Sequence, residues 1–477
     1  MSIEANSSSC RFPCGRVDAV VRNRRDFLKK VGAGFGSVAL LDLLAGEGLL
    51  GAAAGGAPTL AHHAPTAKSV IWLFMEGGPS AMDTFDPKPE LARHDGQQPK
   101  LPIDVFFGSA GPLMKSPFEF RRHGESGTWV CDRMPHIARH VDDLALIRSC
   151  YAESPSHGPA MYQMNTGLIR TGFPSVGAWL SYGLGSQNRN LPGFVVLQNS
   201  KGSKGGANNW GSGFLPSEFQ ATPFRSKGAP ILNLNRPVDI TDERQRRMLD
   251  LAADLNRGHA AAFPGESELL GRIESYELAF RMQTDATEAV DFSKETNSTK
   301  ELYGFNQEVT RPYGEKCLLA RRLVERGVRF VQAYCDDEWD SHNGLKDQHS
   351  RRMKETDQPV AALLTDLKQR GLLDETLVIW GGEFGRMPVS EKGDGRDHNP
   401  HGFLVWMAGG GIRGGVHHGE SDEIGWKAAV NPVSVHDLHA TILHCLGLDH
   451  ERLTYLHNGR RFRLTDVEGE VIRSILA

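Results

Sequence analysis

Carboxylates and histidines gather in five short segments of this 477-residue chain, each beside a stretch typical of a strand. The residues among them that could bind a metal are Glu76, Asp340, His342, Glu383, Asp397, His398 and His401. Asp340 and His342 are two residues apart, a spacing that lets both turn inward from a loop but not from one helix face. Mixed carboxylate and imidazole sets suit zinc, manganese or iron, whereas all-oxygen sets suit calcium or magnesium. These residues therefore predict a centre for one or two divalent metal ions, of Zn, Ca, Mn or Mg type.

Residues close to these segments could carry out ester hydrolysis. Arg386 follows Glu383 by three positions, and its guanidinium could either hold a phosphate or sulfate group or form a salt bridge with the same carboxylates. Ser154 and Ser156 are candidate nucleophiles, which would form a covalent intermediate. His157 could instead be a metal ligand, with a bound water as the attacking group, or it could cap the helix that follows. The catalytic candidates are thus the two serines, His157 and Arg386.

Short apolar runs must position these residues. We expect strands at 70–75, 144–149, 193–197, 328–334, 376–380 and 403–408. Helical patterns at 318–325 and 360–368 each end at a glycine and lead into a strand. The repeated order of helix and strand predicts an α/β fold with a mostly parallel sheet and helices on both faces. In such a sheet ligands bind at the carboxyl ends of the strands, where the five segments would meet.

The middle of the chain has a different character. Residues 201–213 are rich in Gly, Asn and Ser, and residues 243–283 are polar, helix-rich and poor in strand signals. We interpret the region around 200–306 as a loop and helix-rich insertion on the α/β core. The alternative is an ordinary helical excursion within the topology of the sheet.

The N-terminus carries an export signal. Arg24 and Arg25 precede Phe27-Leu28-Lys29 and an apolar run over 31–50, which is the pattern of a twin-arginine signal. We therefore expect the twin-arginine translocase as a partner, and a periplasmic or extracellular location. Small residues over 51–58 offer a cleavage site.

The apolar run is a poor membrane anchor because it is short and contains Asp42 and Glu47. We expect no stable membrane span, although a retained anchor is the alternative. The expected division is 1–57 for the signal peptide and its flank, and 58–477 for one α/β domain.

The composition narrows the class of protein further. A net charge of -4 argues against a nucleic-acid partner, which needs a basic face. The five cysteines beyond the leader are scattered, with no C-x-x-C pair, which argues against a cysteine zinc site. Export would allow one or two disulfides among them. These cysteines are Cys131, Cys150, Cys317, Cys335 and Cys445.

Four motifs carry a resemblance to a known family. They are Phe74-Met75-Glu76-Gly77-Gly78-Pro79-Ser80, Trp339-Asp340-Ser341-His342, Gly382-Glu383-Phe384-Gly385-Arg386 and Gly395-Arg396-Asp397-His398. The chain resembles an uncharacterised family of twin-arginine-exported, sulfatase-like proteins of the alkaline phosphatase superfamily, over nearly the whole mature chain. The resemblance implies an alkaline phosphatase/sulfatase-like fold. The family itself supplies no substrate. From the wider superfamily and the acids and histidines above, we expect an exported metal-dependent hydrolase of sulfate or phosphate esters of small molecules or carbohydrates, polysaccharides among them.

The chain departs from the wider superfamily at several positions. The resemblance places Glu76 and Glu383 where the superfamily has Asp, and Phe384 where it has a ligating His or Asn. Counting along the sulfatase nucleophile motif leads to His157 rather than to Cys or Ser, and either His398 or His401 would replace the late histidine. These departures favour the alternative of a catalytically inactive binding or scaffold protein, whereas the dense acids and histidines favour an enzyme.

Overall fold

The computed structural model describes residues 61–477, apart from gaps at 101, 107–108, 199–201, 226–230, 232–233, 235, 263–266, 336–338 and 392. The chain divides into two units, 1–57 and 58–477, and the second contains the fold described below. The predicted export signal lies outside the described residues. No helix in the described ranges is long and apolar enough to cross a membrane.

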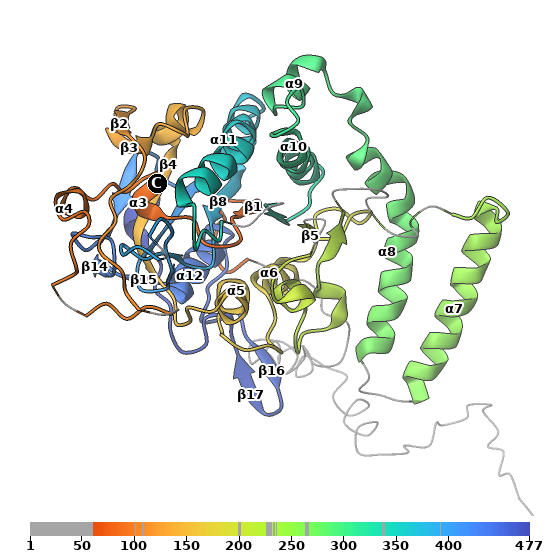
Figure 1. Ribbon diagram of the computed structural model, residues 1–477. Coiled ribbons are helices and arrows are strands. Elements are labelled where there is room, and N and C mark those ends of the chain that lie inside the picture. The colour runs from red at the N-terminus through yellow and green to blue at the C-terminus, as the bar shows by residue number, and fades with distance from the viewer. Residues whose placement is uncertain are drawn as a thin grey trace, which may run out of the picture. The chain divides into compact units, whose positions relative to one another are not determined.

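A nine-stranded sheet forms the centre of the second unit (Figure 1). Its order is β12 (Val416–His418), β4 (Leu144–Tyr151), β11 (Phe403–Ala408), β8 (Thr376–Gly381), β1 (Ser69–Phe74), β7 (Phe330–Tyr334), β5 (Phe194–Leu197) and β6 (Thr222–Phe224), with β15 (Val433–Ser434) also paired to β4. Strand β11 runs antiparallel to both β4 and β8, and the other pairs are parallel. The predicted mostly parallel sheet is confirmed, and all six expected strands are present within a few residues of their expected bounds.

Helices cover both faces of the sheet. One face carries α10 (Arg311–Glu325) and α11 (Leu345–Gln369), and the other carries α5 (His157–Thr166), α6 (Val176–Leu184) and α12 (Val435–Cys445). Because side chains alternate along a strand, β1 sends Ile71 and Leu73 to the first face and Trp72 and Phe74 to the second. Every residue of β1 is buried, which explains why this strand is a continuous apolar run.

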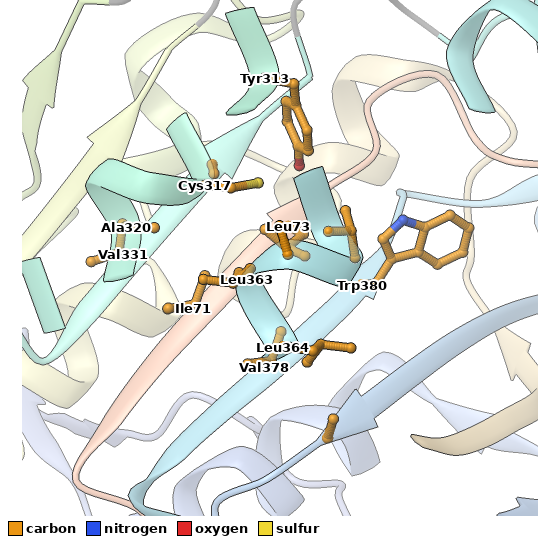
Figure 2. Packing of buried hydrophobic residues seen from close by; sticks show 14 of the residues in the cluster. Ile71, Leu73, Tyr313, Cys317, Ala320, Val331, Leu363, Leu364, Val378 and Trp380 are labelled. Carbon is orange, nitrogen blue, oxygen red and sulfur yellow. The ribbon is translucent and has the colours of Figure 1, made fainter. Parts of the chain in front are cut away.

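The core on the first face is shown in Figure 2. It brings together Ile71, Leu73, Tyr313, Cys317, Ala320, Val331, Leu363, Leu364, Val378 and Trp380. Full burial of each large apolar side chain contributes roughly 1.5–3 kcal/mol, so this layer fixes α10 and α11 firmly on the sheet.

The expected helical stretch at 243–283 is two helices, α7 (Asp242–Ala262) and α8 (Ser267–Val290), which pack along each other. The remaining helices are α3 (Ala81–Thr84), α4 (Pro89–Arg93) and α9 (Asn297–Leu302). Four small antiparallel pairs complete the described elements: β2 (Phe120–His123) with β3 (Thr128–Cys131), β9 (Gly385–Arg386) with β10 (His398–Asn399), β13 (Glu420–Ser421) with β14 (Ala428–Val430), and β16 (Tyr455–His457) with β17 (Arg460–Phe462).

The cysteines are unpaired in the structure. All five beyond the leader are free and buried, so the one or two disulfides that export would allow are not present among them. Burial raises the pKa of the Cys445 thiol to about 11, which makes it unreactive at neutral pH.

Candidate metal centre

Five loops converge at one edge of the sheet. Strands β1, β4, β7 and β8 run in the same direction, so their carboxyl ends lie at the same edge. Strand β11 runs the opposite way and therefore begins at this edge. The loops after the four parallel strands carry Glu76, His157, Asp340 and Glu383, and the loop before β11 carries His398.

Asp340 is the centre of the contacts. Its Oδ1 lies 2.9 Å from His342 Nε2, 3.2 Å from His398 Nε2 and 2.8 Å from Arg386 Nη2. Its Oδ2 lies 3.0 Å from His157 Nε2 and 3.0 Å from Lys204 Nζ. Burial alone would raise the pKa of this carboxyl. The hydrogen bonds with His157 and His342, the contact with His398 and the charge of Arg386 outweigh burial and hold the pKa far below its usual range.

Two of these histidines are oriented by groups that accept hydrogen bonds. His398 Nδ1 lies 2.6 Å from the carbonyl oxygen of Pro155, and His342 Nδ1 lies 2.5 Å from Glu391 Oε2. A carbonyl oxygen only accepts, so His398 Nδ1 must carry a proton. Burial lowers the pKa of His398, which favours the neutral ring and leaves a lone pair on Nε2. This is the tautomer that a metal-binding histidine needs.

The donor set fits a divalent cation. Asp340 Oδ1 lies 2.9 Å from His342 Nε2 and 3.2 Å from His398 Nε2, and the two nitrogens are 2.9 Å apart. Ligands about 2.0–2.2 Å from a tetrahedral ion are roughly 3.3–3.5 Å apart, so a small relaxation would accommodate one. Two further overlapping groups have ligand atoms within 4.8 Å of one another: His157, Asp340 and His398, and His342, Asp397 and His398.

Glu383 and His157 form the inner wall of this centre. Glu383 is fully buried, and its Oε1 lies 2.6 Å from His157 Nδ1. The backbone N–H of Gly77 donates to both Glu383 oxygens, at 3.0 and 3.2 Å. Burial lowers the pKa of His157, but its hydrogen bonds with Asp340 and Glu383 outweigh burial, so the net pKa is raised. His157 thus lies between two carboxylates, which favour its protonated form.

Gly77 is required by the close approach of two loops. Its φ is +107°, which side chains rarely tolerate, and a Cβ there would lie 2.5 Å from Trp339 N and 2.7 Å from Asp340 N. The loop after β1 can thus pass directly against the loop that carries Asp340.

Arg386 is buried in protein contacts. It donates to the carbonyl oxygens of Gly77, Gly78 and Arg396, the last two at 3.0 and 3.1 Å, as well as to Asp340. Of its two readings from the sequence, the structure displays the salt bridge with a carboxylate of the centre. Its guanidinium joins three of the loops at this edge.

The remaining candidates lie at different distances from the centre. Glu76 is buried and its Oε1 accepts from the backbone N–H of Lys204 at 2.7 Å. Ser154 Oγ accepts from the backbone N–H of Ser156, which is the N-cap of α5. Helix α5 begins at His157, so the expectation that His157 caps the helix is wrong.

His401 lies apart from the other histidines. His401 is exposed, and the centroid of its ring lies 6.5 Å from that of the Trp426 ring. None of the three groups of possible metal ligands given above includes it. Of the two histidines that the sequence left as alternatives, His398 lies beside the other candidate ligands and His401 does not.

Phe384 forms an apolar wall beside two histidines of the centre. Its ring centroid lies 4.5 Å from that of His398 and 4.9 Å from that of His157. It therefore shields one side of both imidazoles from water instead of contributing a ligand atom.

The sequence reasoning missed two charged residues of the centre. Lys204 approaches Asp340 from the Gly-rich loop after β5, and the rule that ligands bind at carboxyl ends of strands would have found it. Glu391 orients His342 from a turn that the backbones of Glu391 and Gly395 close. No local pattern marks Glu391, because its role depends on a contact 49 residues away in the chain.

A buried network below the centre holds two of its loops. Arg396 and Asp83 are fully buried and paired at 2.8 Å. His349 Nε2 accepts from the backbone N–H of Ser80 at 3.3 Å, and its Nδ1 lies 3.0 Å from Ser341 Oγ. Burial lowers the pKa of His349 to about 3, so the ring is neutral. It links the loop after β1 to the loop that carries the metal-binding candidates.

Comparison with known proteins gives one family and several distant folds. The family described as "Protein of unknown function (DUF1501)" matches residues 67–476. No curated protein matches the chain.

Among solved structures, a sulfatase, PsFucS1 from Pseudoalteromonas sp., is 14% identical, with 89% of this chain and 72% of that chain covered and a TM-score of 0.35. The protein titled Ps i-CgsB is 11% identical over 80% of this chain and 72% of its own, with a TM-score of 0.37. The alkaline phosphatase from the Antarctic bacterium TAB5 is 10% identical, with 76% of this chain and 96% of that chain covered and a TM-score of 0.32. All three TM-scores are below 0.5, and no conclusion about this chain is drawn from these distant matches.

Proposed function

The chain belongs to the family described as "Protein of unknown function (DUF1501)", and we propose that it is an exported, metal-dependent hydrolase of sulfate or phosphate esters. One observation carries the proposal. Asp340 Oδ1, His342 Nε2 and His398 Nε2 lie 2.9–3.2 Å apart, and the far nitrogen of each imidazole faces a hydrogen-bond acceptor. Such anchoring is what metal-binding histidines have in proteins.

Asp340, His342 and His398 would hold the metal, with His157 and Asp397 as further ligands if a second ion binds. A divalent metal supplies Lewis-acid activation of an ester and lowers the pKa of water. Its identity, among Zn, Ca, Mn and Mg, is left to experiment.

The chain's own residues would bind and orient the ester. Lys204 Nζ, on a partly exposed side chain 3.0 Å from Asp340 Oδ2, brings a positive charge to the open side of the centre. His157 is hydrogen-bonded to two carboxylates and could move a proton at Nε2, the atom that faces Asp340. Glu383 fixes the other nitrogen of that ring, and Phe384 keeps water from its face.

A decisive experiment combines metal analysis with activity. Protein purified from its native host should contain a divalent metal and hydrolyse members of a panel of aryl sulfates and phosphates. In this reading His157→Ala and Glu383→Ala abolish turnover, whereas Ser154→Ala and Ser156→Ala retain most of it. Loss of turnover on either serine substitution, with metal content unchanged, would make that serine the nucleophile.

A binding or scaffold protein without turnover is the second candidate. Phe384 favours it, because an apolar ring 4.5 Å from His398 takes a place where the superfamily resemblance expected a ligand. Metal-replete protein that binds inorganic sulfate or phosphate, but turns over none of the panel, would support this candidate over the enzyme.

Export by the twin-arginine translocase, to the periplasm or beyond, is part of the proposal and rests on Arg24 and Arg25. Replacing both by lysine should retain the precursor in the cytoplasm. Undiminished export of that variant would refute this part alone.

A further inference from the structure

Helix α7 presents an apolar stripe to solvent. Met248, Leu251 and Leu255 are 52%, 61% and 67% exposed. Their spacing of three and four residues puts them on one face of the helix. Three large apolar side chains in a row on one helix face mark an interaction site more often than scattered exposed residues do.

The opposite face of α7 already has its partner. Arg246 pairs with Glu277 of α8 through two hydrogen bonds, at 2.9 and 2.5 Å, and Ala253 is buried. Helix α7 lies on the outer side of α8, away from the sheet (Figure 1). The stripe therefore faces away from the fold, on a helix whose orientation the pair with α8 fixes.

The charges beside the stripe are self-complementary. Arg247 precedes Leu251 by four residues and Asp254 follows it by three. Arg247 and Asp254 are seven residues apart, so they flank the stripe on the same edge. Helix α7 contains four arginines and four acidic residues, and this balance lacks the basic excess that attracts a helix to an anionic membrane.

We propose that this stripe pairs with the α7 stripe of a second copy of the chain, antiparallel, about a two-fold axis near Leu251. In that arrangement Leu251 packs against its own counterpart, and Met248 lies near the counterpart of Leu255. Arg247 of each copy lies beside the opposite copy's Asp254, which gives two symmetric ion pairs. The proposal is independent of ester hydrolysis, because it uses no residue of the metal centre.

One helix from each copy forms a small interface, so the dimer is expected to dissociate reversibly in the micromolar range. Sedimentation equilibrium of the full chain across that range should show a mass that rises towards twice the 52.4 kDa of one chain. Leu251→Glu should give the mass of a single chain at every concentration, because it places two like charges on the axis. Leu456→Glu is the matched control, since Leu456 is 56% exposed on the separate β16–β17 hairpin.

The charge pair gives a second test that does not depend on the apolar stripe. Arg247→Glu should weaken the dimer by at least tenfold, and the double change Arg247→Glu with Asp254→Arg should restore it. A wild-type chain that stays monomeric, a dimer that survives Leu251→Glu, or a charge exchange that fails to restore pairing would each overturn the proposal. Flotation of a monomeric wild type with phosphatidylglycerol vesicles, lost in Leu251→Glu, would overturn it in favour of a membrane surface.

Discussion

Glu391 should control metal affinity although it does not touch the metal in this reading. Its Oε2 lies 2.5 Å from His342 Nδ1 and its side chain is largely buried, so the weak energies of exposed ion pairs do not apply. A charge-assisted hydrogen bond contributes about 1.5–3 kcal/mol, and loss of a carboxylate behind a metal-binding histidine lowers affinity about 10- to 100-fold. The two ranges agree, because tenfold corresponds to about 1.4 kcal/mol.

Glu391→Gln keeps an oxygen that can accept from His342, so we expect about a tenfold loss of affinity, and Glu391→Ala should approach a hundredfold. The assay is competition for Zn²⁺ or Mn²⁺ against a chromophoric chelator. Glu468→Gln is the matched control, because Glu468 pairs with His436 at 3.0 Å away from the centre. Equal affinity in wild type, Glu391→Ala and Glu468→Gln would refute the placement of the metal at His342.

Three further predictions concern stability. Asp83→Ala leaves Arg396 buried without its carboxylate and should cost about 3–5 kcal/mol in urea unfolding, against less than about 1 kcal/mol for the exposed Glu375→Ala. Gly77→Ala should cost at least about 2 kcal/mol, from its positive φ and the backbone overlap, and stability and metal affinity that both stay at the wild-type level would contradict this. Burial lowers the pKa of His439 to about 3, so its neutral form stabilises the fold above the unfolded pKa near 6.5, and this contribution is lost as pH falls towards 3. Between pH 7 and 5 the loss is about 2 kcal/mol, and His439→Leu should flatten the pH dependence of unfolding by that amount.

The sheet was predictable because its strands are buried on both faces. A strand such as β1, with no exposed residue, must be a continuous apolar run, and the loops at the carboxyl ends then follow from the rule for open sheets. The same rule selects Asp340, His342, Glu383 and His398, which the structure brings together, but it also selects His401, which lies apart.

The finer partners of the centre were not predictable from local sequence. Glu391 and Lys204 reach it through loops whose paths depend on tertiary packing, and Phe384 occupies a position that the resemblance gave to a ligand. His401 matched the pattern as well as His398 did, but in the structure His398 contacts Asp340 whereas the ring of His401 faces Trp426. The division between α7 and α8 could have been read from the sequence, because Pro264-Gly265 lies between the two helices and this dipeptide marks a turn.

The central position of β1 has a consequence for synthesis of the chain. Its two neighbours in the sheet, β7 and β8, begin at Phe330 and Thr376. About 260 more residues must therefore be synthesised after Val70 before its first pairing partner, Phe330, exists. At about 5–20 residues per second this is roughly 13–50 s, during which a fully buried, largely apolar strand has neither edge paired. Truncated chains that end before β7 should therefore aggregate or recruit chaperones, and the centre that joins residues 76 to 398 can only come together once synthesis is nearly finished.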